Sequence, residues 1–372
     1  MRTKTLTLTS GLAAALSLAV SWSVTVAGQG APPRPAAAKS ADTPRTADGR
    51  PDLTGVYDIA TLTPLDRPAM FGDKGAITSE EARRLEKQVA DRIDAAARPS
   101  DGNRAAPPIG GDGSAGAAGN VGGYNNFWID SGTQYVTIDG KKRTSIIVDP
   151  PNGHVPALTA AARQRNAGRG AQPTSDQSES TGDPGLERGA GAYDDPERRP
   201  LAERCLLGFG STSGPPALPV LYNNLHQIVQ TKDTVLILNE MDHDARVVRM
   251  NSTHLPPTVR KWLGDSIGWW DGDTLVVETT NFTDKTRFRG ATENLKVTER
   301  FSRLDGKTLL YRFTIDDPAT WERTWTGEYT WPATDDLLYE YACHESNYAL
   351  GNILRGARQR DAEDAAKRGA NR

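Results

Sequence analysis

One short stretch, directly after the apolar run 235–238, concentrates acidic side chains, a histidine and an arginine. It consists of Glu240, Met241, Asp242, His243, Asp244, Ala245 and Arg246. A histidine beside a carboxylate can act as an acid–base pair, because the carboxylate fixes the imidazole tautomer and favours its protonated form. We therefore predict catalytic roles for His243 and Asp244 and ligand contacts from Glu240 and Arg246. The alternative is a buried ion-pair network around Arg246 that holds two strands in register.

A second cluster lies at residues 339–345. In an extended strand, Glu340 and His344 point to one side, whereas Tyr339, Tyr341 and Cys343 point to the other. Because a carboxylate and an imidazole share one face, we predict that Glu340 and His344 are also catalytic.

The N-terminal residues have the three-part plan of a secretory signal. Two basic residues precede an apolar run from 6 to 26, and small residues occupy positions 25–27 at its end. We expect cleavage after Ala27, which places the mature protein in the periplasm or outside the cell, with no membrane attachment. A transmembrane anchor is the alternative.

The two cysteines, Cys205 and Cys343, are then the only thiols in an oxidising compartment. A disulfide between them is the expected arrangement, and a catalytic thiol is the alternative. This bond would bring His344 close to the segment 222–226. In that segment Tyr222, Asn224 and His226 are predicted ligand-binding residues.

Three histidines, His226, His243 and His344, would then converge on one cavity. Three histidines and a carboxylate can bind zinc, but neither a His-Glu-x-x-His motif nor paired cysteines are present. We therefore assign no metal and expect ordinary hydrogen-bonded histidines; a metal site is the alternative.

Opposite charges are also expected on two apolar strand faces. Glu299 shares its face with Leu295, Val297 and Phe301. Arg323 lies in one phase with Trp321, Trp325, Tyr329 and Trp331. Glu299, Arg323 and Trp325 are therefore predicted to anchor a ligand inside a barrel. The alternative is that the aromatic stripe is simply core.

Other familiar sites are missing from the sequence. The run Gly110-Gly111-Asp112-Gly113 lacks the ending of a phosphate-binding loop, and the glycine-rich run 208–214 fits no nucleophile elbow. We therefore predict no cofactor. The formal charge changes from −3 to −5 when the two basic residues of the signal are removed, which argues against nucleic acid as a partner.

The elements that must position these residues are mostly strands. Residues 262–345 alternate apolar and polar positions and predict an antiparallel meander. Asp-Gly turns at 271–272 and 305–306 predict two hairpins. The expected strands are 274–282, 295–303, 308–315, 321–331 and 337–343.

Further strands are predicted upstream, at 52–58, 134–138, 143–149, 220–230 and 234–250. A capping box at 78–81 predicts a helix, residues 256–262 form at most a short helix, and residues 346–367 form a C-terminal helix. Low-complexity composition marks 28–50 as a disordered lead-in and 98–123 and 166–199 as loops. One β-rich domain, residues 51–358, is followed by a charged tail, 359–372.

The predicted fold is mainly β, with a few short helices. The absence of β-α-β alternation excludes Rossmann and TIM-type folds. The runs 143–151 (RTSIIVDPP), 240–246 (EMDHDAR), 262–266 (WLGDS) and 272–282 (GDTLVVETTNF) resemble those of a family of secreted bacterial proteins of unassigned activity. A second likeness is to calycin or lipocalin-like barrels, which implies that the meander closes and that a helix follows it.

Two classes of function fit these patterns. The first is a secreted or periplasmic enzyme that performs general acid–base catalysis on a small organic molecule, as a lyase, isomerase or hydrolase. The second is a non-catalytic small-molecule binder with an aromatic-lined barrel. A structural role in the envelope is a third hypothesis, and the oligomeric state stays open.

Overall fold

The computed structural model describes residues 43–96, 103, 129–167, 193–208, 214–285 and 288–370. The predicted signal peptide, residues 1–27, lies outside the described residues. So do most of the predicted lead-in 28–50 and most of the loops 98–123 and 166–199. The described part of the lead-in forms a hydrogen-bonded turn, in which the Asp52 N–H donates to the Pro44 carbonyl at 2.8 Å.

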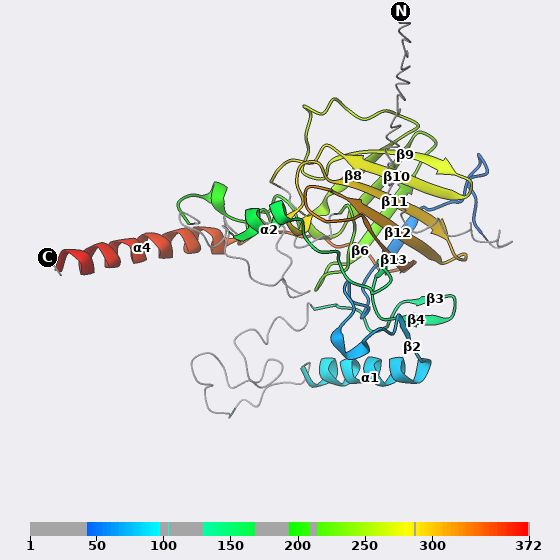
Figure 1. Cartoon of the computed structure of the whole chain (residues 1–372), viewed down its shortest axis with the longest axis horizontal. Coiled ribbons are helices and arrows are strands. Elements are labelled where there is room, and N and C mark those ends of the chain that lie inside the picture. The colour runs from blue at the N-terminus through cyan, green and yellow to red at the C-terminus, as the bar shows by residue number, and fades with distance from the viewer. Residues whose placement is uncertain are drawn as a thin grey trace, which may run out of the picture.

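A ten-stranded sheet dominates the described chain and curls into a half-barrel (Figure 1). Its strands, in spatial order, are β1 (Gly55–Asp58), β6 (Leu225–Gln230), β7 (Thr234–Asn239), β8 (Ala245–Met250), β9 (Asp265–Asp271), β10 (Thr274–Thr280), β11 (Lys296–Arg303), β12 (Thr308–Asp316), β13 (Trp325–Pro332) and β5 (Ile147–Asp149). Neighbouring strands are antiparallel except β8 and β9, which are parallel because residues 251–264 cross between them.

The predicted hairpins are confirmed. Asp271 pairs with Thr274 across a turn in which Gly272 has φ +61°, a conformation that favours glycine. Arg303 pairs with Leu309 across the second Asp-Gly turn. The strands from β9 to β13 therefore form the predicted meander.

The predicted strand 337–343 is wrong, because these residues form irregular chain and turns. The open side of β13 is occupied by β5, which pairs Ile147 with Gly327. Directly after β13, Ala333 and Thr334 bond to β1 instead of leading into another strand of the meander. Leu337 and Tyr339, which the alternation would place inward, are 69% and 71% exposed.

Three other predicted strands have different limits. The expected strand 321–331 begins at Trp325, because residues 321–324 bend away from the ladder. The segment 143–149 is divided: β4 (Lys141–Arg143) pairs with β3 (Thr137–Ile138), whereas β5 joins the large sheet. The segment 220–230 becomes a strand only from Leu225.

The two sides of the half-barrel approach each other at one point. Tyr57 on β1 forms an antiparallel bridge with Ala333, which follows β13. Beside this bridge the Thr334 N–H donates to the Val56 carbonyl at 3.0 Å. β1 and β5 are nevertheless the two ends of the strand order.

Aromatic side chains fill the concave interior, where the strands are largely buried. They include Tyr57, Phe301, Tyr311, Phe313, Trp325, Tyr329 and Trp331, none of which is measurably exposed. The Tyr311 and Trp331 ring centroids are 4.7 Å apart. Ala217 enters this interior, where its N–H donates to the Tyr311 hydroxyl and its carbonyl accepts from the Tyr329 hydroxyl, each at 3.0 Å. The aromatic stripe is therefore core.

A smaller sheet of β2 (Ala76–Ile77), β4 and β3 lies beside α1 (Ser79–Ala96). The predicted capping box is present, since the Glu81 N–H donates to Thr78 Oγ1 at 3.1 Å and the Thr78 N–H donates to Glu81 Oε2 at 2.9 Å. Ala82 is buried, and Glu86 on α1 pairs with Lys142 on β4 at 2.8 Å. The helix thus packs on the small sheet.

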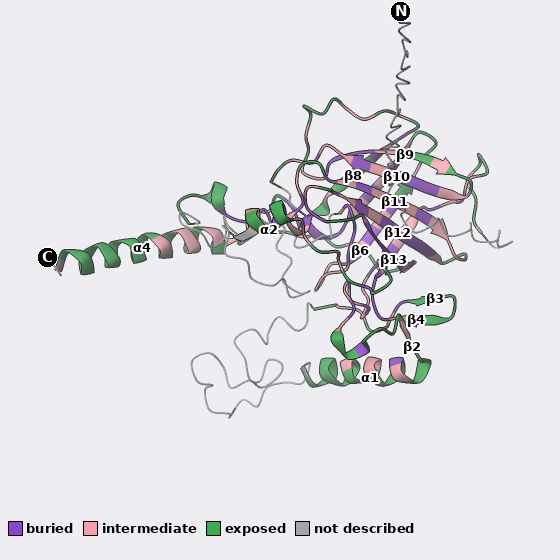
Figure 2. Ribbon diagram, in the orientation of Figure 1, coloured by how far each residue is buried: buried purple, intermediate pink, exposed green. Residues whose placement is uncertain are grey.

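Within the described residues, the other helices are α2 (Ala160–Ala167) and α4 (Tyr348–Ala370), with 3-10 turns at Ala69–Phe71, Pro196–Arg198, Met241–His243 and Phe288–Gly290. Residues 256–262 form only a turn. The predicted C-terminal helix is confirmed as α4, which projects from the sheet and is mostly exposed (Figure 2).

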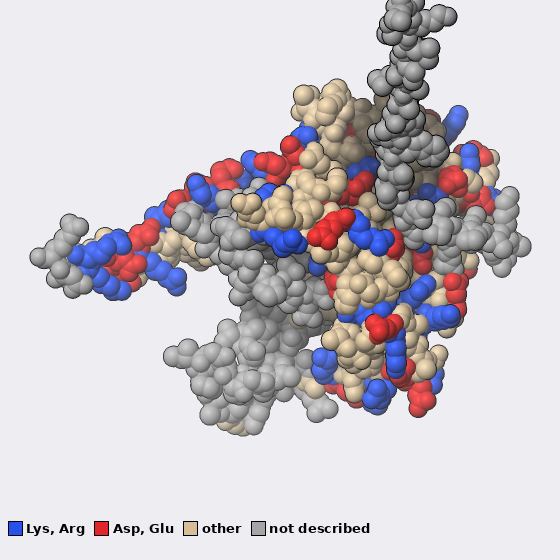
Figure 3. All heavy atoms as spheres, viewed as in Figure 1, with Lys and Arg blue, Asp and Glu red and all other residues tan. Residues whose placement is uncertain are grey.

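Both charge signs are interspersed along α4 and over the visible face (Figure 3). Within the described residues, none of the helices combines the length and apolar character that crossing a bilayer requires.

Candidate functional site

The stretch 240–246 bends instead of continuing as a strand. β7 ends at Asn239, the 3-10 turn Met241–His243 follows, and β8 begins at Ala245. Asp242 and His243 have φ of 58° and 45°, in the left-handed region. The Asn239 N–H donates to the Asp244 carbonyl at 2.9 Å, which closes the bend. The bend therefore divides the predicted strand 234–250 into β7 and β8.

Asp242 is the most unusual group in this bend. The residue is only 7% exposed, and its buried Oδ2 has no hydrogen-bond partner among the described residues. Burial raises the pKa of the Asp242 carboxyl, while the charges of His243 and His344 act in the opposite direction. Sequence reasoning did not select Asp242, although it lies between two residues that were selected.

The two histidines near Asp242 come from distant parts of the chain. His243 follows it directly, and its Nδ1 is bonded to the Asp242 main-chain carbonyl. His344 lies in the turn that follows Cys343. Both histidines are exposed, so they connect the buried carboxyl with solvent.

A pair of tyrosines adjoins the same carboxyl. The Tyr341 hydroxyl donates to the Tyr222 hydroxyl. Burial, the neighbouring Tyr222 and the Asp242 carboxylate all raise the pKa of Tyr341. Burial raises the pKa of Tyr222 as well, and its bond from Tyr341 opposes this. Asp242, His243, His344, Tyr222 and Tyr341 are called the Asp242 cluster below.

A second acidic group, the Asp58 cluster, lies at the end of β1 and consists of Asp58, Asp130, Glu240 and Asp336. Burial raises the pKa of the Asp58 carboxyl to about 6, although the Ala60 N–H bond opposes this, and the charges of the other three members add to the increase. Hydrogen bonds between side chains and the backbone hold two members of this cluster in place. Asn224 Nδ2 donates to the Asp130 carbonyl at 2.8 Å, and the Tyr339 N–H donates to Glu240 Oε1 at 3.1 Å.

Arg246 and Glu299 belong to a different network, inside the half-barrel. Arg246 Nη2 lies 2.9 Å from Glu299 Oε1, and Nη1 also pairs with this carboxylate. The Tyr311 hydroxyl donates to Glu299 Oε1 at 2.8 Å. Glu299 is therefore buried as predicted, and its partner is Arg246. This arrangement corresponds to the buried ion-pair alternative.

Arg323 does not point into the interior, contrary to the prediction. Its side chain is 46% exposed and pairs with Asp149 on β5 at 2.8 Å. The strand phase that placed it inward does not apply, because the ladder begins two residues later at Trp325. Trp325 itself is fully buried in the core.

The predicted residues are therefore only partly brought together. Asn224 and Glu240 lie in or beside the Asp58 cluster, and His243 and His344 lie in the Asp242 cluster. His226 is buried against Trp331, with ring centroids 5.1 Å apart, and its Nδ1 is 3.2 Å from the Asn224 carbonyl. Glu340 is exposed. Among the described residues, no group of three His, Cys, Asp or Glu side chains could hold a metal ion.

The disulfide between Cys205 and Cys343 is confirmed, with Cα atoms 5.7 Å apart. It fixes the turn that holds His344 against residues 201–208. The bond therefore determines where one member of the Asp242 cluster lies.

Sequence reasoning also missed a histidine on the outer face of the sheet. His254 Nδ1 is 3.1 Å from Asp265 and its Nε2 is 3.3 Å from Glu278. Burial opposes ionisation of Asp265, but hydrogen bonds from the Leu255 N–H and His254 outweigh it and lower the pKa of Asp265. These bonds attach the crossing segment 251–264 to β9 and β10, which is a structural role.

Comparisons with protein-family models, with curated proteins and with solved structures return no match.

Proposed function

We propose that this protein is a secreted or periplasmic enzyme that moves a proton on a small organic molecule, as a lyase, isomerase or hydrolase. Asp242 is the proposed base. The observation that supports this most strongly is its buried carboxyl oxygen, which has no hydrogen-bond partner in the described part of the chain and lies near two histidines and a hydrogen-bonded tyrosine pair. A buried, incompletely paired carboxylate is costly to stability and typical of functional sites.

Each neighbour of Asp242 has a proposed role. His243 and His344 are exposed and exchange protons between the site and solvent. Tyr341 keeps its proton, and this single donor would turn from Tyr222 to a bound substrate and stabilise negative charge that develops there. These steps need only side chains.

The proposal also includes a closed barrel, membership of a protein family and secretion. The bridge between Tyr57 and Ala333 supports closure of the half-barrel into a calycin-like barrel. The signature runs RTSIIVDPP, EMDHDAR, WLGDS and GDTLVVETTNF support membership of a family of secreted bacterial proteins. The apolar N-terminal segment and the disulfide support secretion.

Elimination of 5-nitrobenzisoxazole tests the proposed base directly. A base removes the ring C–H proton, the N–O bond breaks, and its electrons form a coloured phenolate, so no other co-reactant is needed. The full chain should accelerate this reaction above the buffer rate. Asp242→Asn should remove about 10²-fold or more of that acceleration, as expected for a general base.

Asp233→Asn is the matched control, because Asp233 is an exposed residue of the β6–β7 turn. It should leave the rate unchanged. A wild-type rate equal to buffer, or equal rates for wild type and Asp242→Asn, would contradict the proposal.

A non-catalytic binding protein is the second candidate. It is favoured by a cavity of 420 Å³ beside α4. Binding of a small molecule there without turnover would select this alternative.

A further inference from the structure

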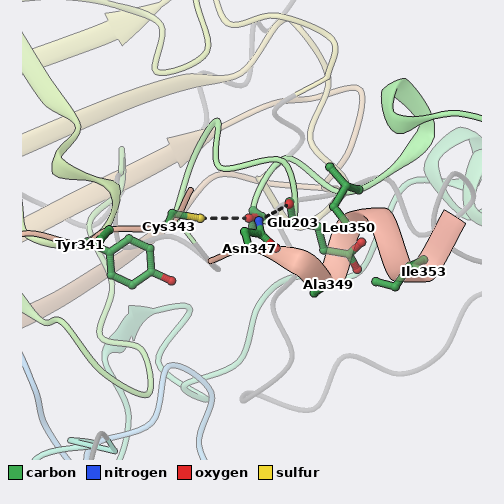
Figure 4. A pocket seen from close by; sticks show the side chains of 9 residues that line it. Glu203, Tyr341, Cys343, Asn347, Ala349, Leu350 and Ile353 are labelled. Carbon is green, nitrogen blue, oxygen red and sulfur yellow. Dashed lines mark hydrogen bonds between the residues drawn. The ribbon is translucent and has the colours of Figure 1, made fainter. Parts of the chain in front are cut away.

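A cavity of 420 Å³ lies between the disulfide region and the first turns of α4 (Figure 4). It is lined by Ala202, Glu203, Tyr341, Ala342, Cys343, Asn347, Ala349, Leu350 and Ile353. Small-molecule sites have volumes of roughly 300–1,000 Å³, so this cavity suits a compound of one or two rings or a short hydrocarbon chain.

The polar groups in this wall are already bonded to the protein. Glu203 is held by Arg199, whose Nε and Nη2 each lie 2.9 Å from a carboxylate oxygen. Asn347 Nδ2 donates to the Glu203 carbonyl at 3.4 Å. The remaining wall consists of small and aliphatic side chains, the Cys343 sulfur and the Tyr341 ring. A ligand that touches this wall therefore gains most from apolar, uncharged surface.

Tyr341 belongs both to this cavity and to the Asp242 cluster. Its ring lines the cavity, its hydroxyl donates to Tyr222, and it interacts electrostatically with Asp242. A molecule in the cavity is thus next to the side chain that adjoins the proposed base.

We propose that this cavity is the apolar subsite of the enzyme, which seats the ring or hydrocarbon part of an uncharged substrate and directs its reacting group past Tyr341 toward Asp242. This inference rests on the proposed function for the reaction, whereas the binding step stands on the cavity alone. Removal of apolar surface from water supplies the affinity.

The disulfide is part of this subsite. Cys343 lines the cavity, and its partner Cys205 lies in the segment that supplies Ala202 and Glu203. Apart from the disulfide, the two segments are joined by long hydrogen bonds from Asn347 Nδ2, at 3.4 Å to the Glu203 carbonyl and 3.4 Å to Cys205 Sγ. Reduction of the native protein should therefore weaken binding.

Binding of the neutral fluorophore N-phenyl-1-naphthylamine to the full chain tests the subsite. Wild type should bind it with a fluorescence increase. Leu350→Trp, which places an indole ring in the cavity, should weaken binding about tenfold. Ala362→Trp, on an exposed distal turn of α4, is the matched control and should bind as wild type does. If Leu350→Trp does not fold, Ile353→Trp from the next turn replaces it.

Two readouts separate this inference from the proposed function. In the 5-nitrobenzisoxazole assay, Leu350→Trp should raise KM with little change in kcat, whereas Asp242→Asn should lower kcat and keep fluorophore binding. Unchanged fluorophore binding and KM in Leu350→Trp would overturn the subsite and leave the Asp242 result standing. A different result would separate binding from catalysis. If Leu350→Trp blocks fluorophore binding but Asp242→Asn does not slow the elimination, the cavity is a binding site without a link to catalysis.

Discussion

Arg246 on β8 and Glu299 on β11 form a buried ion pair although two strands, β9 and β10, lie between theirs in the sheet. Flat neighbouring strands are about 4.8 Å apart, so three strand spacings would separate these side chains. The pair forms because the sheet curls and both residues point to its concave side. It thus connects opposite sides of the half-barrel interior.

Loss of the Glu299 charge should destabilise the fold strongly. Glu299→Gln leaves the Arg246 guanidinium buried without a counter-charge, and breaking a buried pair in this way costs about 3–5 kcal/mol. Urea unfolding measures the free energy. Glu278→Gln, on the outer face, is the control and should cost under about 1 kcal/mol. Equal losses for both variants would show that the internal pair is not important for stability.

Asp58→Asn should stabilise the protein at neutral pH but not in acid. Burial raises the pKa of the Asp58 carboxyl to about 6 in the folded state, whereas the ordinary pKa of an aspartate is 3.8. The contribution of this carboxyl to stability therefore falls as pH rises between these values. Asparagine carries no charge and keeps an oxygen for the Ala60 N–H bond.

Urea unfolding at pH 7.5 should give a gain of about 1 kcal/mol for Asp58→Asn, after allowance for solvent screening. Near pH 4 the variant and wild type should unfold alike. A loss of stability at pH 7.5 would contradict the assigned environment of Asp58.

Removal of the disulfide should cost stability and disturb the Asp242 cluster together. The bond joins residues 138 positions apart, and the chain-entropy model gives about 5 kcal/mol for a loop of this size. The double variant Cys205→Ser/Cys343→Ser should unfold at lower urea and show a lower kcat/KM in the elimination assay. Titration of the native wild type with a thiol reagent should find no free thiol, and two reactive thiols would contradict the bond.

The sequence was informative where local rules determine structure. The Asp-Gly turns and alternation predicted β9 to β13, and the Thr78–Glu81 spacing predicted the start of α1. The prediction failed at 337–343 because strand formation there depends on which segments pair nearby, and β13 pairs with β5 at its start while the residues after it bond to β1. No local pattern contains this information.

The candidate site, too, was predicted where local sequence determines it and missed where distant segments meet. The stretch 240–246 was recognised by composition, and its connection to His344 followed from the two cysteines. Arg323 was misplaced because a bend shifted the strand phase. Asp58 was missed because its neighbours, Asp130, Glu240 and Asp336, are distant in sequence and only the curled sheet brings them together.

The most direct test of the central claim is the pH dependence of kcat/KM for 5-nitrobenzisoxazole elimination by the full chain. A base must be deprotonated to act, and burial raises the pKa of Asp242. The rate should therefore increase with pH through an inflection above the ordinary carboxyl value of 3.8 and then level off. Asp242→Asn should lose this inflection. The same inflection in Asp242→Asn and in wild type would contradict the assignment of Asp242 as the base.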